Sequence, residues 1–304
     1  MGDPAGGTRV GELRVKGRQV RTDRPLVMAI LNANTDSFSD PGPRDLDKLL
    51  DRAARFAAEG AAIIDVGAQS GITGRAPVPA EAEIAAVRPV VREIARSLPG
   101  VLISVDTFKD DVAEAVLDAG AHLINDVSGL RNQRIAELCA RHEAALVIMH
   151  TSAPPLHKLQ DPDRYQDVTM ETMRYLDRQC ELAVRLGLPE DAIIIDPGPD
   201  FTKTPAQTIE LLRNARRFAE FGKPLLLALS RKDFVGALTQ RSPVDRTAGT
   251  LGAIAALRHL PDQILRVHDV QSTVDLLAVF DAITGDTPIP RDLTVPHRLL
   301  HQQA

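Results

Sequence analysis

The 304-residue sequence has only two cysteines, Cys139 and Cys180, and no tryptophan. Both cysteines lie inside patterns typical of helices, so we expect neither a disulfide framework nor a metal site with four thiolate ligands. Such sparse cysteine usage is typical of a protein from a reducing cytoplasm. The aromatic content of 3% offers no stacking platform for single-stranded nucleic acid.

An excess of positive charge and a long apolar run are also missing. The formal net charge is -5 and the pI is about 5.9. This balance argues against a nucleic-acid partner, because neutralising many phosphates requires a basic face. No apolar run approaches about 18 residues and no secretory signal pattern opens the sequence, so we expect no membrane partner. The sequence predicts a soluble cytoplasmic protein.

Eight short apolar runs recur along the chain, and each ends on small or polar residues. They are PLVMAILN, AAIIDVG, VLISVDT, HLINDVS, ALVIMHT, AIIIDPG, PLLLALS and QILRVHD. Amphipathic helical patterns separate them; the one over residues 45–59 carries Leu46, Leu49 and Leu50 on one face. Apolar runs that alternate with such helices are typical of parallel strands buried on both faces.

Eight strand-helix units in a chain of this length predict the α/β class and a single (β/α)8 TIM barrel. An open doubly wound sheet is the alternative, but there the polar strand ends gather beside one switch point rather than on all strands. The preceding stretch VGELRVKGRQV predicts a short hairpin that suits a plug at one barrel end. We therefore expect a tail and hairpin over residues 1–19, a barrel over 20–285 and a Pro-rich tail over 286–304.

The carboxyl ends of all barrel strands meet at one mouth, so the polar residues there form the candidate site. These residues are Asn32, Asp65, Asp106, Asn125, His150, Asp196, Ser230, Lys232, Arg266 and His268. Buried carboxylates without partners are costly, so the alternative for Asp106, Asn125 and Asp196 is pairing with Lys232 or backbone amides for purely structural reasons. For Asp65 the alternative is a strand cap or loop anchor, and for His150 a structural histidine.

Two kinds of chemistry suit this mouth. Carboxylates and an amide can accept paired N–H donors from a heterocycle such as an aminopyrimidinone, and Asp196 is the candidate for that bidentate contact. Arg266 and His268 are two apart in one strand, so they share a face and can hold one anion together. Asn32 can supply a neutral ligand to Mg²⁺ or a hydrogen bond to a diphosphate. We expect a ring on one side of the mouth and an anion on the other.

Motifs spread over nearly all of residues 10–284 resemble the dihydropteroate synthase family. The matching stretches are ILNANTDSFSD, IIDVG, ISVDTFKDDVAEAVLDAGAHLINDVSG, MH, IIDPGPDFTKT, LSRKDFVG, TAGTLGAIAAL and RVHDV. Their shared order and spacing carry the resemblance. It implies a barrel, usually a homodimer, that condenses 6-hydroxymethyl-7,8-dihydropterin diphosphate with the aromatic amine p-aminobenzoate. It also implies Mg²⁺-assisted departure of diphosphate and capture of a pterin-methyl cation by the aniline nitrogen.

The resemblance assigns roles to individual residues. It implies pterin binding by Asp106, Asn125, Asp196 and Lys232, and diphosphate binding by Asn32, Arg266 and His268, with Asn32 as the Mg²⁺ ligand. Ser70, Arg75, Phe201 and Ser230 form the expected acceptor subsite. The expected catalytic residues are Asp106, Lys232, Arg266 and His268.

The loops expected to hold the acceptor depart from the family pattern. Family members have Gly-Glu-Ser-Thr-Arg-Pro-Gly after the second strand. In the aligned GAQSGITGRAP, Ser70 remains, Gly71-Ile72-Thr73 stand in place of Thr-Arg-Pro, and Arg75 comes three residues late. The first loop has Asn34-Thr35 in place of Thr-Pro. The identity of the acceptor is therefore the open part of the prediction.

The loop after the sixth strand also differs. Pro199 and Asp200 stand where the family commonly has an aliphatic residue and glycine, whereas Phe201 and Lys203 are retained. Three hypotheses remain: condensation with p-aminobenzoate or a related amine, a recruited paralogue that catalyses a different condensation or cyclisation, and a pterin-binding protein without turnover. The retained diphosphate residues favour catalysis over binding alone.

Overall fold

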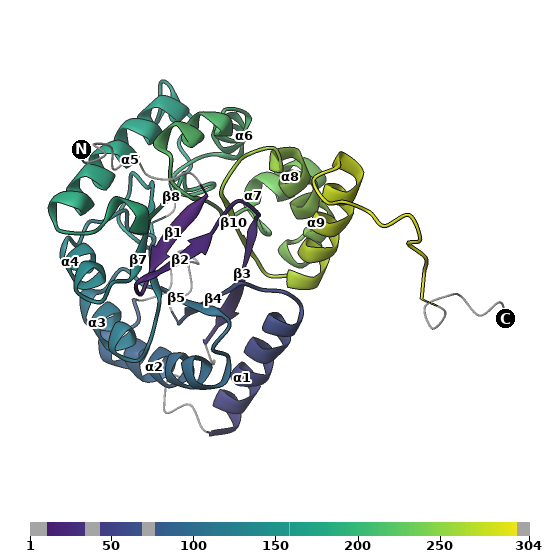
Figure 1. Cartoon of the computed structure of the whole chain (residues 1–304). Coiled ribbons are helices and arrows are strands. Elements are labelled where there is room, and N and C mark those ends of the chain that lie inside the picture. The colour runs from purple at the N-terminus through teal and green to yellow at the C-terminus, as the bar shows by residue number, and fades with distance from the viewer. Residues whose placement is uncertain (1–10, 34–42, 69–76, 158, 297–304) are drawn as a thin grey trace, which may run out of the picture.

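The computed structural model describes residues 11–33, 43–68, 77–157 and 159–296 as a closed barrel of eight strands surrounded by helices (Figure 1). The barrel strands are β3 (Leu26–Asn32), β4 (Ile63–Gly67), β5 (Leu102–Asp106), β6 (Leu123–Asp126), β7 (Ala145–Met149), β8 (Ile193–Asp196), β9 (Leu225–Leu227) and β10 (Gln263–Val267). Each pairs in parallel with the next, and β10 closes on β3. The predicted (β/α)8 barrel is confirmed, and the open sheet is excluded by this closing pair.

Helices and short 3₁₀ segments fill the connections between strands. The helices are α1 (Pro43–Ala58), α2 (Ala80–Ser97), α3 (Asp110–Asp118), α4 (Arg134–Arg141), α5 (Val168–Arg185), α6 (Pro205–Arg213), α7 (Asp233–Thr239), α8 (Thr247–Leu257) and α9 (Val270–Thr284), and the 3₁₀ segments are η1 (Glu190–Ala192), η2 (Ala215–Phe221) and η3 (Pro243–Asp245). None of the described helices combines the length and apolar composition needed to cross a membrane. Cys139 in α4 and Cys180 in α5 are free thiols and buried.

Three helices that follow barrel strands begin with a side-chain cap. Asp167 accepts a hydrogen bond from the backbone N–H of Met170 at the start of α5, and Asp269 accepts one from Ser272 at the start of α9. At α6, Thr204 and Gln207 cap each other's backbone N–H groups in a capping box. These caps fix the loops through which the strand ends lead into the helical shell.

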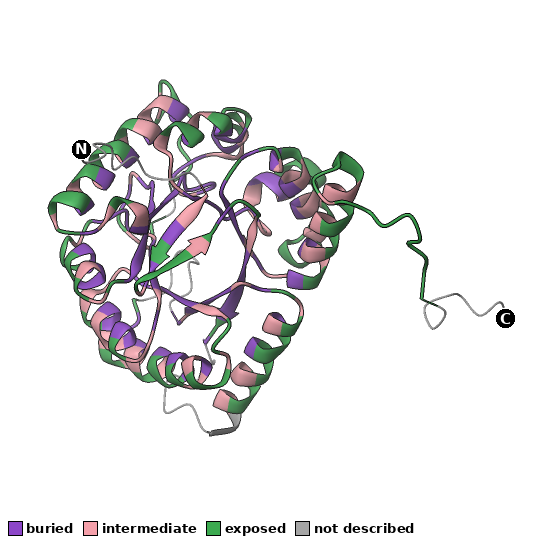
Figure 2. Ribbon diagram, viewed as in Figure 1, coloured by how far each residue is buried: buried purple, intermediate pink, exposed green. Residues whose placement is uncertain are grey.

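The alternation of side chains along each strand separates two apolar layers. One set of strand side chains packs outward against the helices, whose inward faces are buried and outer faces exposed (Figure 2). The opposite set fills the barrel interior near the strand starts, with Met28, Ile63, Leu123, Ile194 and Ile264 among its members. Residues two further along each strand share this inner face. The inner face therefore changes from apolar at the strand starts to polar at the strand ends.

The N-terminal hairpin closes the barrel end opposite the polar mouth. Strands β1 (Glu12–Val15) and β2 (Arg18–Arg21) pair antiparallel and lie across the ring of strands in Figure 1. Lys16 and Gly17 have φ values of 50° and 70°, as in a type I′ hairpin turn. Leu13 and Val15 are buried in the interior apolar layer. The predicted hairpin is confirmed, and it acts as an apolar plug at the strand starts.

Replacing Leu13 by alanine should destabilise the barrel markedly. The Leu13 side chain is fully buried in the interior layer, so Leu13→Ala removes apolar contacts and leaves a cavity. A substitution of this kind costs about 2–5 kcal/mol in the free energy of unfolding. The same change at Leu293, which is 67% exposed, is the matched control and should cost less than about 0.5 kcal/mol. Urea denaturation compares the two variants, and equal midpoints would contradict the plug.

Candidate active site

The polar ends of the inner face bring most of the predicted residues to one mouth. Asp65 on β4, Asn125 on β6 and Asp196 on β8 follow apolar inner-face residues by two positions, and Asp106 on β5 follows Ser104 in the same register. Arg266 on β10 follows Ile264 in the same way. Asp65, Asn125 and Asp196 are each no more than 2% exposed. Buried charges at this density require partners, and their pairing decides what the site can bind.

Arg266 lies between two carboxylates. Its Nε donates to Asp65 Oδ2 at 2.6 Å, and its Nη2 donates to Asp106 Oδ2 at 2.8 Å. Burial raises the pKa of Asp106, and the positive charge of Arg266 opposes that rise. In the described part of the chain no hydrogen bond engages the third nitrogen, Nη1, which stays available to an anion. Asp65 is thus held in an ion pair with Arg266 rather than acting as a strand cap or loop anchor, and this pair fixes the orientation of Arg266.

His268 is held by the hydroxyl of Ser230. The His268 backbone N–H donates to Ser230 Oγ at 3.3 Å, and Oγ lies 2.9 Å from His268 Nδ1. Because Oγ already accepts from the backbone, its own hydrogen is free to donate to Nδ1, which leaves the ring proton on Nε2. Burial, with help from Arg231 and other nearby cations, lowers the pKa of His268 to about 4. The ring is therefore neutral near pH 7 and carries an N–H donor at Nε2.

Asn125 and Asp196 present acceptors at the same mouth. Asn125 Nδ2 donates to Asp65 Oδ2 at 3.2 Å, whereas its buried Oδ1 has no hydrogen-bond partner among the described residues. Asp196 Oδ1 accepts the backbone N–H of Gly198 at 2.7 Å. Burial raises the pKa of Asp196 to about 6, against the opposing effects of that N–H and of nearby cations. An unpaired amide oxygen and an ionisable carboxylate suit a ligand with N–H donors.

Lys232 lies just before α7, with its Nζ 4.3 Å from the centroid of the Phe201 ring. An ammonium at this distance is attracted to the face of an aromatic ring. Burial lowers the pKa of Lys232, and the carboxylates of Asp200 and Asp196 oppose this change. Phe201, from the loop after β8, and Lys232, from the loop after β9, thus meet at the mouth.

Lys203 is fully buried. Its retention in the family motif marked it in the sequence, but no role was predicted for it. Its Nζ donates to the carbonyls of Gly198 at 2.9 Å and Phe201 at 3.1 Å, and lies 2.9 Å from His150 Nδ1. Burial lowers the pKa of Lys203 to about 7 and that of His150 to about 2. His150 also packs against the rings of Tyr165 and Tyr175. The pair braces the loop that carries Phe201.

The remaining predicted residues differ in position. Asn32 ends β3 with an exposed side chain at the mouth. Ser70 and Arg75 lie outside the described residues, as do Asn34 and Thr35. Ser230, predicted in the acceptor subsite, contacts His268 on the proposed diphosphate side.

A groove of about 660 Å³ lies away from the strand ends, on the outer shell between α5 and η2. Its lining includes Met173, Cys180 and Phe221, rimmed by charged side chains of both signs. None of the polar mouth residues lines it. The groove therefore has no part in the candidate site.

Sequence comparison relates this barrel to known enzymes. The model of the family described as pterin binding enzyme matches residues 28–268. The chain is 37% identical over 273 residues to a dihydropteroate synthase of Streptococcus pyogenes serotype M18, covering 88% of this chain and 98% of the relative. It is 35% identical over 272 residues to that of Escherichia coli, covering 89% and 96%.

Solved structures agree with this relationship. The Xanthomonas albilineans dihydropteroate synthase with 4-aminobenzoic acid superposes with a TM-score of 0.81 at 36% identity, covering 91% of this chain and 100% of the other. The same enzyme in complex with 7,8-dihydropteroate gives 0.78 at 34% identity, with 90% and 99% covered. Both superpositions cover at least 90% of this chain. The chain belongs to the pterin binding enzymes and, among them, to the dihydropteroate synthase family.

Proposed function

We propose that this chain is a dihydropteroate synthase-like transferase that condenses 6-hydroxymethyl-7,8-dihydropterin diphosphate with p-aminobenzoate or a related amine and releases diphosphate. One observation carries the proposal: among the described residues, β6 and β8 present acceptors to the mouth, whereas β10 and the residue that follows it present donors without hydrogen-bond partners; we call these the acceptor side and the donor side. The acceptors are Asn125 Oδ1, which has no partner among these residues, and the Asp196 carboxylate, whose Oδ1 accepts the Gly198 N–H, and the donors are Arg266 Nη1 and His268 Nε2. Family membership supports the same reaction.

The acceptor side suits the pterin. An ionised Asp196 can accept both the ring N–H and the 2-amino group of the pterin, while Asn125 Oδ1 takes a further N–H. Lys232 supplies a donor to the ring carbonyl from the neighbouring loop. Asp106 accepts a hydrogen bond from Arg266 and lies opposite Asn125 on the neighbouring strand. Its carboxylate is placed to stabilise positive charge that develops on the pterin methylene.

The donor side suits the diphosphate. Arg266 keeps its planar group in place through Asp65 and Asp106 and offers Nη1, while neutral His268 offers Nε2–H. As the bond between the methylene carbon and oxygen breaks, its electron pair goes to the diphosphate. The charge that grows on the leaving oxygens is then met by these donors. The amine lone pair forms the new carbon–nitrogen bond, and the amine loses one proton.

The donor set also fits Mg²⁺. This ion binds proteins through one or two oxygen ligands and takes its remaining ligands from substrate phosphate and water. Asn32 provides one amide oxygen at the mouth, and the described residues contain no cluster of three or more His, Cys, Asp or Glu side chains able to hold a metal. Asn32 would hold the ion together with the diphosphate. Bound there, Mg²⁺ would neutralise negative charge on the leaving group.

The acceptor subsite is proposed at Phe201, Ser70, Arg75 and Ser230. Lys203 donates to the backbone carbonyl of Phe201, and the Phe201 ring supplies an apolar wall beside Lys232. A related Xanthomonas albilineans enzyme has a structure with 4-aminobenzoic acid, which supports an aromatic amine as acceptor. The changed sequence Gly71-Ile72-Thr73 makes this subsite the part of the proposal that most needs a direct test.

We also propose a cytoplasmic homodimer. The last helices expose apolar side chains that a second copy can cover, with Val279 60% and Ile283 80% exposed on α9. These two side chains are four residues apart in α9 and so lie on the same exposed face of the helix. Free, buried thiols at Cys139 and Cys180 are compatible with a reducing compartment.

The purified protein should release diphosphate from 6-hydroxymethyl-7,8-dihydropterin diphosphate in the presence of Mg²⁺ and p-aminobenzoate. We expect the release to depend on p-aminobenzoate and to yield dihydropteroate, detected by mass spectrometry. Release without that dependence would identify another nucleophile as the acceptor. Pterin binding without any release would instead favour a recruited paralogue or a protein that binds pterin without turnover.

Replacing Asp196 by asparagine should weaken pterin binding about ten- to hundredfold. The variant keeps the acceptor for the Gly198 N–H but loses the charge that strengthens two hydrogen bonds to the ligand. Calorimetry with free pterin and with inorganic diphosphate measures the effect on each side of the mouth. His268→Ala is the complementary variant: it should weaken diphosphate binding and spare free pterin. An unchanged pterin affinity in Asp196→Asn would exclude the proposed role of Asp196.

Pterin binding should be coupled to deprotonation of Asp196. Burial raises the pKa of Asp196 to about 6, and only the ionised carboxylate accepts both pterin donors. Affinity should therefore be constant above pH 7 and fall toward about tenfold per pH unit below pH 6. Calorimetry at pH 6 in two buffers of different ionisation enthalpy should detect proton release on binding. Asp196→Asn should show neither effect, and an equal pH dependence in both proteins would refute the assignment.

A further inference from the structure

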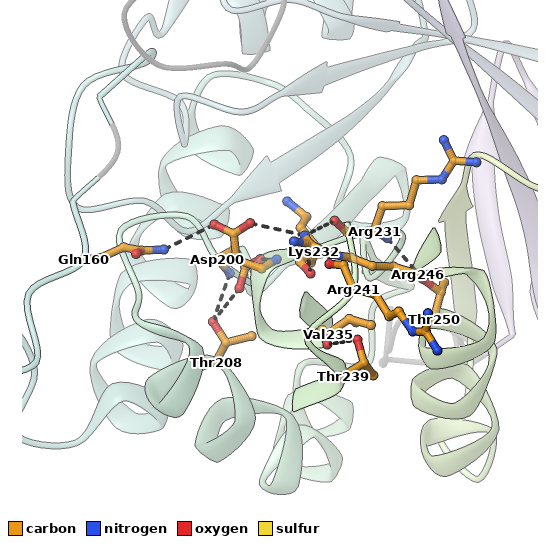
Figure 3. A network of polar contacts seen from close by, with 11 residues as sticks. Gln160, Asp200, Thr208, Arg231, Lys232, Val235, Thr239, Arg241, Arg246 and Thr250 are labelled. Carbon is orange, nitrogen blue, oxygen red and sulfur yellow. Dashed lines mark hydrogen bonds and ion pairs between the residues drawn. The ribbon is translucent and has the colours of Figure 1, made fainter. Parts of the chain in front are cut away.

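Asp200 occupies an unusual position in the loop after β8. Its side chain is 7% exposed, and its φ of 64° lies in the left-handed region, which aspartate tolerates better than most residues. The Asp200 N–H donates to Thr208 Oγ1 at 3.1 Å, and that hydroxyl donates to Asp200 Oδ1 at 3.2 Å. Oδ2 accepts the backbone N–H of Asp233. The carboxylate thus joins the β8–α6 loop to the first residue of α7 (Figure 3).

The segment that Asp200 reaches is also held from the opposite side. Arg246, just before α8, donates through Nη1 to the carbonyls of Arg231 at 3.0 Å and Lys232 at 3.1 Å. Thr250 Oγ1 accepts the Arg231 N–H at 3.1 Å (Figure 3). Arg231 has a φ of 61°, so this turn relies on surrounding contacts to persist. The backbone on both sides of Lys232 is therefore fixed, by α8 on one side and by Asp200 on the other.

The charges around Lys232 come from four elements. Asp200 on the β8–α6 loop, Asp196 on β8 and Asp233 on α7 are anionic neighbours, and Arg266 on β10 is a cationic one. Burial lowers the pKa of Lys232, and Asp200 opposes this more than either other carboxylate does. Burial also raises the pKa of Asp200, and Lys232 opposes that rise. Lys203 is a further buried cation that faces Asp196 and Asp200. Asp200 and Lys232 thus stabilise each other's charged forms.

We propose that Asp200 is a positioning residue for Lys232. The Asp200 carboxylate fastens the start of α7 to the β8–α6 loop and acts as the counter-charge of the Lys232 ammonium. Its effect on ligand binding rests on the proposed role of Lys232 in the pterin subsite. Its effect on Lys232 itself does not. Asp200 therefore raises the upper pH limit of the subsite, because a neutral Lys232 cannot serve as a cationic donor.

Two substitutions separate the two parts of this role. Asp200→Asn keeps an oxygen for the Asp233 N–H and removes the charge. Asp200→Gly removes both, while glycine adopts the φ of 64° without strain. Glu210→Gln removes an exposed carboxylate from α6 and is the matched charge control. The asparagine variant keeps the test decisive if the glycine variant folds poorly.

The protonation of Lys232 can be followed without any ligand. The chain has seven lysines, so ¹³Cε-labelled lysine gives few signals, and Lys232→Arg assigns the one that belongs to Lys232. We expect the Lys232 titration midpoint to move to lower pH in Asp200→Asn and Asp200→Gly and to stay in place in Glu210→Gln. A wild-type midpoint in Asp200→Asn would overturn the counter-charge and reduce Asp200 to a backbone cap.

Pterin diphosphate binding across pH supplies the second readout. At neutral pH we expect Asp200→Asn to bind within about threefold of the wild type and Asp200→Gly about tenfold more weakly, because only the latter frees the start of α7. The alkaline loss of affinity should begin at lower pH in Asp200→Asn than in Glu210→Gln. If the wild type binds no pterin, the proposed function fails, and the lysine titration still decides the role of Asp200. If the wild type binds pterin and the alkaline loss of affinity begins at the same pH in Asp200→Asn and Glu210→Gln, the proposal is contradicted.

Discussion

The candidate site depends on the guanidinium of Arg266, held between the carboxylates of Asp65 and Asp106. Alternation along parallel strands aims both carboxylates into one mouth, where two like charges in a dry site would repel each other and resist burial. Arg266 compensates the negative charges of both carboxylates. It thereby connects β10 to β4 and β5 across β3, which lies between β10 and β4 in the barrel. Removing it would leave two uncompensated carboxylates, so the charge balance of the mouth and its shape have the same origin.

This pairing also decides which atoms remain for a ligand. Asp65 accepts from Arg266 and from Asn125, which turns the amide so that Asn125 Oδ1 is left without a partner in the described structure. Arg266 retains Nη1 for the same reason, and Ser230 leaves only Nε2 of His268 as a donor. The acceptor and donor atoms that remain for a ligand are thus fixed before any substrate enters. Such preorganisation is what electrostatic stabilisation of a leaving anion requires.

The sequence predicted the parts of this arrangement that follow from the apolar runs and their polar ends. The eight runs predicted the strands, and the polar residues that end them, such as Asn125 and Arg266, predicted most of the mouth. The partners of those residues were not predictable, because hydrogen bonds between Arg266 and Asp65 join positions 201 residues apart. Lys203 and Asp200 come from a loop without periodicity, and their burial follows from backbone angles such as the φ of 64° at Asp200.

The proposed site residues divide between strands, which constrain the direction of a side chain closely, and loops, which constrain it less. Groups proposed to bind pterin and diphosphate lie mostly on paired strands, where a shift of one residue would turn a side chain out of the mouth. Loop residues have no such constraint, and the departure at Asp200 falls in the loop between β8 and α6, whereas Gly71-Ile72-Thr73 lie outside the described residues. Asp200 nevertheless reaches α7 and Lys232 through its carboxylate. A loop change at this position therefore acts on the pterin side as well, through charge and through the backbone of α7.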